Sequence, residues 1–135
     1  MLGGEHCGVP AMNRVLSVAI GGAIGAVLRY LVQNWSLGRV GAAFPYGTLV
    51  VNVSGAFWIG LIMTFLLNHV HISPLWRVFL VTGILGGYTT FSALTWESYA
   101  LWTQGVPLQS VLYTGGSFAG GMLALWIGVL VGRSL

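Results

Sequence analysis

Charged residues are scarce in this sequence. Only 5% of its 135 residues are charged, and these are five arginines and two glutamates, with no lysine and no aspartate. A soluble domain carries about a quarter charged residues, so the composition excludes an ordinary soluble fold. The net charge of +3 comes from scattered arginines rather than a basic cluster, which argues against a nucleic-acid-binding surface. With 56% hydrophobic residues, the chain is predicted to be an integral membrane protein.

Residues that build disulfides or catalytic centres are equally scarce. The single cysteine, Cys7, excludes an intrachain disulfide. His69 and His71 fall in a loop, where solvation is the expected role rather than metal binding, and the sequence does not indicate an enzyme. The chain starts without the basic region and apolar core of a signal peptide. Because Met12 would serve equally well as an initiator, residues 1–11 are expected to be a flexible or non-native extension.

Four apolar stretches are long enough to cross a bilayer, which takes about 20 residues each. They cover residues 15–32, 47–67, 75–102 and 108–132. The segments between them contain the glycine, proline, asparagine and serine residues that interrupt regular structure. No repeat or domain linker is visible, so residues 1–135 are predicted to form a single four-helix transmembrane domain of the all-α class.

Small residues and charge balance both bear on assembly. Glycines four residues apart let helix backbones approach closely, and such pairs occur at Gly21/Gly25, Gly116/Gly120 and Gly128/Gly132. So many packing faces favour an oligomer, although packing inside the monomer explains any one pair equally well. The arginines are nearly balanced between the two sides of the membrane, and positive residues set orientation. A weak bias permits insertion both ways, and hence an antiparallel dimer.

The third apolar stretch contains an unusual segment, "GGYTTFS", at residues 86–92. Gly86 and Gly87 each disfavour helix by roughly 1 kcal/mol relative to alanine, so the helix is predicted to break here, near its middle. A break frees backbone carbonyls that lipid cannot satisfy, and is tolerated only inside protein. The alternative is that the glycines only allow close packing.

Polar side chains recur on the predicted helices. Thr48 and Asn52 share one face of the second span, and Tyr113 and Ser117 share one stripe of the fourth. Taken singly, each is explained by helix–helix contacts or by bonding to its own helix. The first, second and fourth spans contain no carboxylate, and Glu97 lies toward the end of the third. A donor-rich set without acids suits a small anion better than a cation.

Three ordered motifs carry a family resemblance. "GGAIGAVLRY" (21–30), "GTLVVNVSGAFWIG" (47–60) and "GILGGYTTFSALTWE" (83–97) resemble the signatures of the Fluc/CrcB fluoride channels. The resemblance implies an antiparallel, dual-topology homodimer with two pores in the cell membrane, the inner membrane in bacteria. It implies passive fluoride export that protects a microbe, and a structural sodium ion at the dimer centre.

The resemblance also implies roles for individual residues. By matched position, the pathway would include Asn52, Phe91, Tyr113 and Ser117. The residues whose backbone carbonyls would hold sodium are Gly86 and Thr89. Arg29 and Glu97 match supporting residues of the first and third helices. Two positions depart from the family pattern, because Leu94 stands for a second pore phenylalanine and Gly121 for a serine.

Fluoride is tightly hydrated, and an isolated ion in a medium of low dielectric costs tens of kcal/mol, so a pore must replace water with donors. The hydroxyls of Thr90, Ser92, Thr95 and Ser117, with the Asn52 amide, are candidates. A ring edge of Phe91 would add weak attraction that still lets the ion leave.

Two other interpretations stay open. A small dual-topology four-helix multidrug transporter would be expected to carry a carboxylate in the first helix, and none is present. A non-conducting membrane assembly subunit, in which glycines and hydroxyls only pack helices, gains some support from Leu94. Flux through purified protein in liposomes distinguishes that subunit from a channel.

Overall fold

The computed structural model describes residues 10–69 and 71–135, and within these the regular structure is entirely helical. The elements are α1 (Ala11–Val40), α2 (Tyr46–Asn68), α3 (Pro74–Arg77), the π-helical segment η1 (Val78–Leu85), α4 (Gly86–Tyr88), α5 (Phe91–Thr103) and α6 (Pro107–Ser134). Four spans are long and apolar enough to cross a membrane: α1, α2, the combined third span Pro74–Thr103, and α6. This confirms the predicted all-α class with four membrane-spanning helices.

The first span is longer than the sequence predicts. Residues 33–40 were expected in a loop, but α1 continues through them to Val40 and ends at Gly41, whose positive φ of 76° favours glycine. Its 30 residues extend about 45 Å, well beyond the hydrocarbon thickness of a bilayer. A helix that extends beyond the membrane keeps its own backbone hydrogen bonds. Polar residues after the apolar stretch therefore do not by themselves end the helix. Of the predicted extension, residues 1–9 with Cys7 lie outside the described part, and α1 already begins at Ala11.

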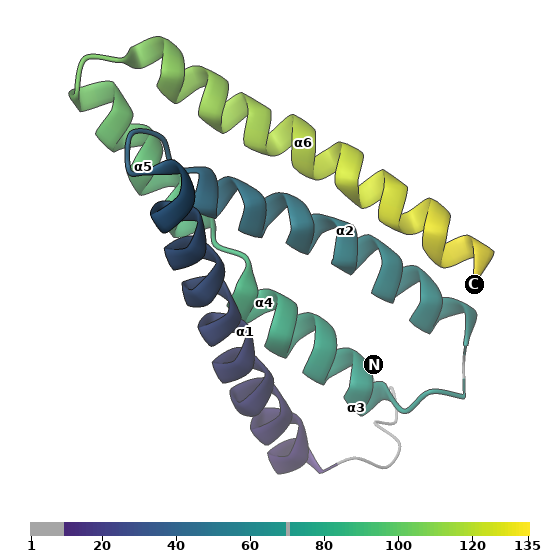
Figure 1. Cartoon of the computed structure of the whole chain (residues 1–135). Helices are drawn as coiled ribbons and strands as arrows, with labels where there is room; N and C mark the ends of the chain where they lie inside the picture. The colour runs from purple at the N-terminus through teal and green to yellow at the C-terminus, as the bar shows by residue number, and fades with distance from the viewer. Residues whose placement is uncertain (1–9, 70) are drawn as a thin grey trace, which may run out of the picture.

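Two helix pairs form the body of the molecule (Figure 1). The C-terminal α6 runs alongside α2, and α1 crosses over η1 and α4 of the third span. Glycines make both contacts close: a Cβ on Gly21 would lie 2.7 Å from the Phe79 carbonyl of η1, and one on Gly132 would lie 2.7 Å from the Leu61 carbonyl of α2. A Cβ on Gly116 would meet nothing within 4 Å. The first and last glycine pairs therefore pack the protomer itself, whereas Gly116 has no such role.

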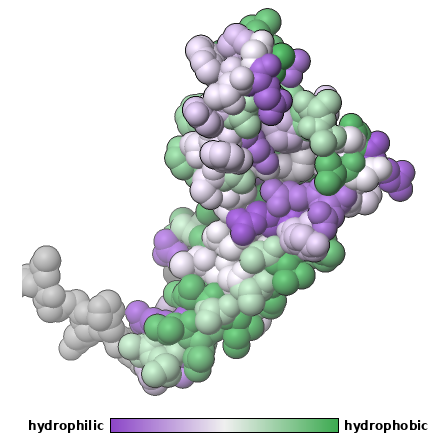
Figure 2. All heavy atoms as spheres, turned by 90° about the vertical axis from the view of Figure 1, so that its left-hand side faces the viewer, coloured by the Kyte–Doolittle hydropathy of each residue, from purple (hydrophilic) through white to green (hydrophobic). Residues whose placement is uncertain are grey.

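Little of the apolar surface is buried inside one chain. Among the described residues, the buried hydrophobic side chains are Val51, Leu85, Leu101 and Tyr113. Figure 2 shows apolar side chains covering the lower part of one face, below a hydrophilic band. With four spans of this composition, the exposed apolar surface is what lipid covers in a multi-pass membrane protein.

The third span is interrupted near its middle, as predicted. Thr89 (φ −76°, ψ 155°) and Thr90 (φ −149°, ψ 118°) are extended, and they separate α4 from α5 (Figure 1). The predicted position of the break, at the glycines, is wrong: Gly86 is helical, with φ −63° and ψ −38°. Gly87 is needed for packing instead, because a Cβ there would lie 2.5 Å from the Gly22 carbonyl of α1. Close packing was the alternative that the sequence left open.

Candidate functional site

Asn52 of α2 closes the break in the third span. Its Nδ2 donates to the Thr90 carbonyl at 3.0 Å, and its Oδ1 accepts from the Thr90 N–H at 2.8 Å. Both backbone groups of an extended residue thus find partners on a neighbouring helix, as a membrane interior requires. An asparagine amide has two hydrogens, so one donor remains beyond this clamp.

Thr89, the residue before Thr90, is held by a side chain from α1. Nη1 of Arg29 on α1 donates to the Thr89 carbonyl at 3.3 Å. The Thr89 hydroxyl donates to the Leu85 carbonyl at 3.0 Å, and its methyl group lies where a side chain on Gly55 would be. Arg29 therefore makes a structural contact inside the protomer.

The hydroxyls at the start of α5 mostly bond to their own segment. The Thr90 hydroxyl caps the helix by accepting from the Ala93 N–H at 3.2 Å, and it lies 3.3 Å from the Ser92 hydroxyl. Thr95 donates to the Phe91 and Ser92 carbonyls, at 3.2 and 2.9 Å. Ser92 and Thr95 are exposed, and neither lines the cavity described next.

A cavity of about 390 Å³ lies between α2, α5 and α6. Four of the predicted pathway residues line it: Asn52, Phe91, Leu94 and Ser117. Phe118 and Gly121 of α6 lie on the same wall as Ser117. The structure therefore brings together the second, third and fourth spans around one mostly apolar cavity with a few polar lining residues.

The Ser117 hydroxyl is the unusual group in this cavity. Ser117 is 5% exposed, and within the described residues its Oγ is the buried side-chain polar atom without a hydrogen-bond partner. The sequence allowed for a bond to its own helix four residues back, but that bond is absent. An unpaired buried hydroxyl costs free energy, so such a group calls for a ligand or water to complete it.

Tyr113 belongs to a second cluster, one helical turn away. The Glu97 carboxylate accepts from the Thr48 hydroxyl at 2.9 Å and from the Tyr113 hydroxyl at 2.6 Å. Gln33 of α1 donates to the Thr48 hydroxyl at 3.0 Å. Thr48 and Tyr113 are each 1% exposed, so four helices meet at one carboxylate.

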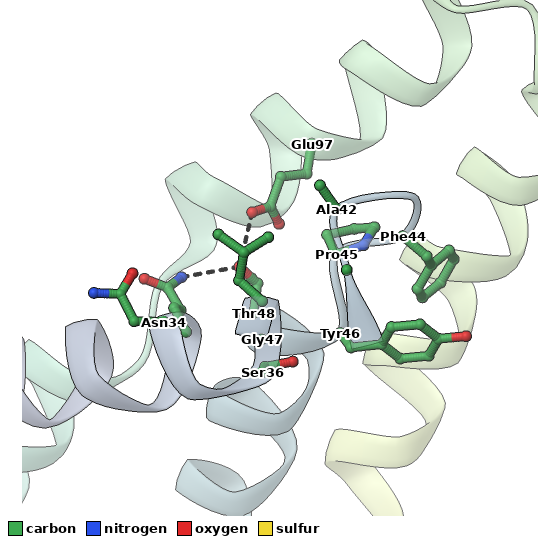
Figure 3. A pocket seen from close by; sticks show the side chains of 12 residues that line it. Asn34, Ser36, Ala42, Phe44, Pro45, Tyr46, Gly47, Thr48 and Glu97 are labelled. Carbon is green, nitrogen blue, oxygen red and sulfur yellow. Dashed lines mark hydrogen bonds between the residues drawn. The ribbon is translucent and has the colours of Figure 1, made fainter. Parts of the chain in front are cut away.

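This carboxylate borders a separate cavity of about 250 Å³ at the end of the molecule where α1 turns into α2. Figure 3 shows Glu97 and Thr48 on one side of it and the Phe44–Tyr46 turn on another. Thr48 precedes Asn52 by one turn of α2, and Tyr113 precedes Ser117 by one turn of α6. Polar side chains thus continue along two neighbouring helices from the Glu97 cavity to the Ser117 cavity.

Two lining residues had no signal in the sequence. Gln33 falls in a segment read as a loop, so its place on the helix facing Thr48 was not expected. Phe118 looks like any lipid-facing aromatic, because only the packing of α6 against α2 and α5 brings it to the cavity.

Comparisons with known proteins match nearly the whole chain. Residues 16–129 match the family described as CrcB-like protein, Camphor Resistance (CrcB). The fluoride-specific ion channel FluC of Rhizobium meliloti is 48% identical over 124 residues, which cover 92% of this chain and 99% of that protein. The protein of the same name from Acidobacterium capsulatum is 46% identical, over 90% of this chain and 98% of its own length. That from Aquifex aeolicus is 41% identical, over 92% of this chain and 100% of its own length.

Proposed function

Because this chain belongs to the CrcB-like family, and relatives named fluoride-specific ion channels match it over nearly their full lengths, we propose that it is a fluoride-selective channel. It lets fluoride leave the cytoplasm passively across a bacterial inner membrane. The observation that carries the proposal at residue level is the cavity between α2, α5 and α6, which is lined by Asn52 and by Ser117, whose buried hydroxyl has no partner among the described residues.

The cavity has the chemistry that a dehydrated anion needs. Ser117 has a hydroxyl hydrogen committed to no protein acceptor, and Asn52 has one amide hydrogen left beyond its clamp. The described α2 and α6 contain no carboxylate, so no fixed negative charge on them opposes the ion. Phe91 is 77% exposed at the edge of the cavity, and a ring edge attracts an anion weakly enough for it to leave again.

The Glu97 cluster serves the entrance of this pathway. Thr48 and Tyr113 both donate to the carboxylate and so disperse its charge, while Gln33 fixes the Thr48 hydroxyl from behind. Tyr113 is accordingly assigned to holding Glu97, rather than to direct contact with the ion in the Ser117 cavity. Ser92 and Thr95 lie beyond that cavity, toward the exposed side of α5, where they contact the ion only if a second copy encloses them.

A second copy completes the pathway. One protomer does not enclose the cavity, and the Phe91 and Phe118 rings that line it are largely exposed. The nearly balanced arginines permit both insertion orientations, so the partner is an antiparallel copy of the same chain, and the dimer has two pores.

A structural sodium ion at the dimer centre fits the residues present. The Thr90 N–H donates to Asn52, so the Gly86 carbonyl lacks the donor that a continuous helix would give it. Among the described residues, the Thr89 carbonyl accepts one long bond, from Arg29, and a carbonyl has two lone pairs. Gly86 is exposed, and its Cβ position meets only the Val81 carbonyl at 3.7 Å. Two carbonyls from each copy would replace the water around one hard cation.

The sodium proposal has its own test, independent of transport. Purification in a larger organic cation in place of sodium is expected to shift the protein from dimer to monomer in size-exclusion chromatography. Return of sodium should restore the dimer. An assembly that is equally stable in both cations would leave the carbonyls of Gly86 and Thr89 without this role.

Fluoride efflux from proteoliposomes, read with a fluoride electrode, tests the channel. Wild type is expected to release fluoride without an energy source. Ser117→Ala should slow efflux while leaving the free energy of unfolding unchanged, because the hydroxyl has no protein partner to lose. Phe91→Ile should also slow efflux, with the dimer intact.

Ser110→Ala is the matched control on the same helix. Ser110 is also buried, at 7% exposure, but its hydroxyl donates to the Ser98 carbonyl at 2.6 Å and does not line the cavity. It should lower stability and leave efflux per folded protein unchanged. If folded wild type releases no fluoride, the channel proposal is wrong, and a non-conducting assembly subunit becomes the better interpretation.

A further inference from the structure

The cavity between α2, α5 and α6 is bordered by two aromatic rings from different helices. Phe91 begins α5, and Phe118 lies on α6 directly after Ser117. Both rings are largely exposed, at 77% and 73%. Within residues 10–69 and 71–135 neither pairs with another aromatic ring, whereas Phe44, Phe57, Phe65 and Phe79 each do. The two rings at the cavity are therefore free to meet something that enters it.

The wall opposite α6 is aliphatic at one point. Leu94 follows Phe91 by one turn of α5 and lines the same cavity. The α5 wall therefore offers one ring and one branched aliphatic side chain, and the second ring comes from α6. The unpaired Ser117 hydroxyl lies one residue from that second ring. Ser117 and Phe118 line the same cavity, so an ion that enters it passes both residues.

We propose that Phe118 is a specificity-determining residue of the anion pathway, supplying from α6 the ring that α5 lacks at Leu94. This rests on the proposed channel function. The positive edge of an aromatic ring attracts a small anion, and the bulk of the Phe118 ring reduces the room in the cavity that Ser117 also lines. A larger anion such as chloride is excluded by that bulk. A lipid-facing role alone would leave ion preference unchanged when the ring is removed.

The test compares fluoride and chloride efflux from proteoliposomes made with the full chain. Phe118→Leu and, as a second ring-free variant, Phe118→Met are expected to lower the fluoride-to-chloride rate ratio about two- to tenfold, the range that one aromatic contact supports. Because Phe118 is exposed in the protomer, both replacements should fold. The double variant Leu94→Phe with Phe118→Leu moves the ring to the α5 wall, and should recover at least part of the ratio.

Trp126→Leu is the matched control. Trp126 is an exposed aromatic on the same helix, at 69% exposure, and does not line this cavity. Its replacement should leave the ratio unchanged. A wild-type ratio in both Phe118 variants overturns this inference while the channel proposal stands. A wild type that conducts no fluoride overturns both together, so the two failures are distinguishable.

Discussion

Replacement of Asn52 should destabilise the protein in a graded way, because its amide closes the break in the third span with two hydrogen bonds. Asn52→Leu removes both partners of Thr90, which is only 9% exposed. A buried backbone group left without a partner costs about 1–3 kcal/mol, so the loss of two predicts a fall of about 2–6 kcal/mol in the free energy of unfolding. Asn52→Asp keeps an acceptor for the Thr90 N–H but aims an oxygen at the Thr90 carbonyl, so it should lose at least one of the two contributions.

Denaturation in detergent micelles measures this, with the six tryptophans as a fluorescence signal. Thr64→Val is a matched control on α2, since the Thr64 hydroxyl bonds only to the Gly60 carbonyl of its own helix. It should change stability by less than about 0.5 kcal/mol. If Asn52→Leu unfolds like this control and yet stops fluoride efflux, Asn52 contacts the ion and does not hold the break.

Three further changes probe the packing and the pathway. Gly87→Ala should destabilise the fold by about 1–3 kcal/mol, because the added Cβ meets the α1 backbone. Gly86→Ala should be neutral or stabilising in the protomer. Equal unfolding curves for the two variants would contradict this packing. Tyr113→Phe removes one of the two donors to Glu97, so the free energy of unfolding should drop by about 1.5–3 kcal/mol and fluoride efflux should slow. Unchanged unfolding and flux would show that the Glu97 cluster is not part of the pathway. Leu94→Phe alone adds a ring to the cavity and should alter fluoride flux or its preference over chloride, measured in proteoliposomes; wild-type values would assign Leu94 to ordinary packing.

The membrane-spanning helices were predictable because hydropathy and length alone decide where a chain can cross a bilayer. The position of the break was not. Because glycine weakens a helix, the break was predicted at Gly86 and Gly87. Gly86 is nevertheless helical, since tertiary packing can override a low helix propensity. The Thr90 N–H bonds to an amide from α2, 38 residues earlier in the chain, and not to the Gly86 carbonyl of its own span. Such a tertiary partner leaves no local signal in the segment that it changes.

The candidate site was predictable to a similar degree. The family resemblance, more than helical spacing alone, assigned Asn52 and Ser117 to one pathway, and both residues line one cavity. The same spacing placed Tyr113 with Ser117, yet a turn of helix is enough to send its hydroxyl to Glu97 instead. Side-chain partners depend on how helices are rotated against one another, and periodicity within one helix does not fix that rotation.

The clamp around the break also bears on the order of assembly. The groups that bond to the Thr89 and Thr90 backbone come from α1 and α2 of the same chain, so these three bonds need no second copy. The shape of the break is then set within one protomer. In the proposed dimer, the two copies would then associate as helices that are already folded, with no coupled refolding in lipid. Weakening that association should therefore release intact monomers rather than unfolded chains.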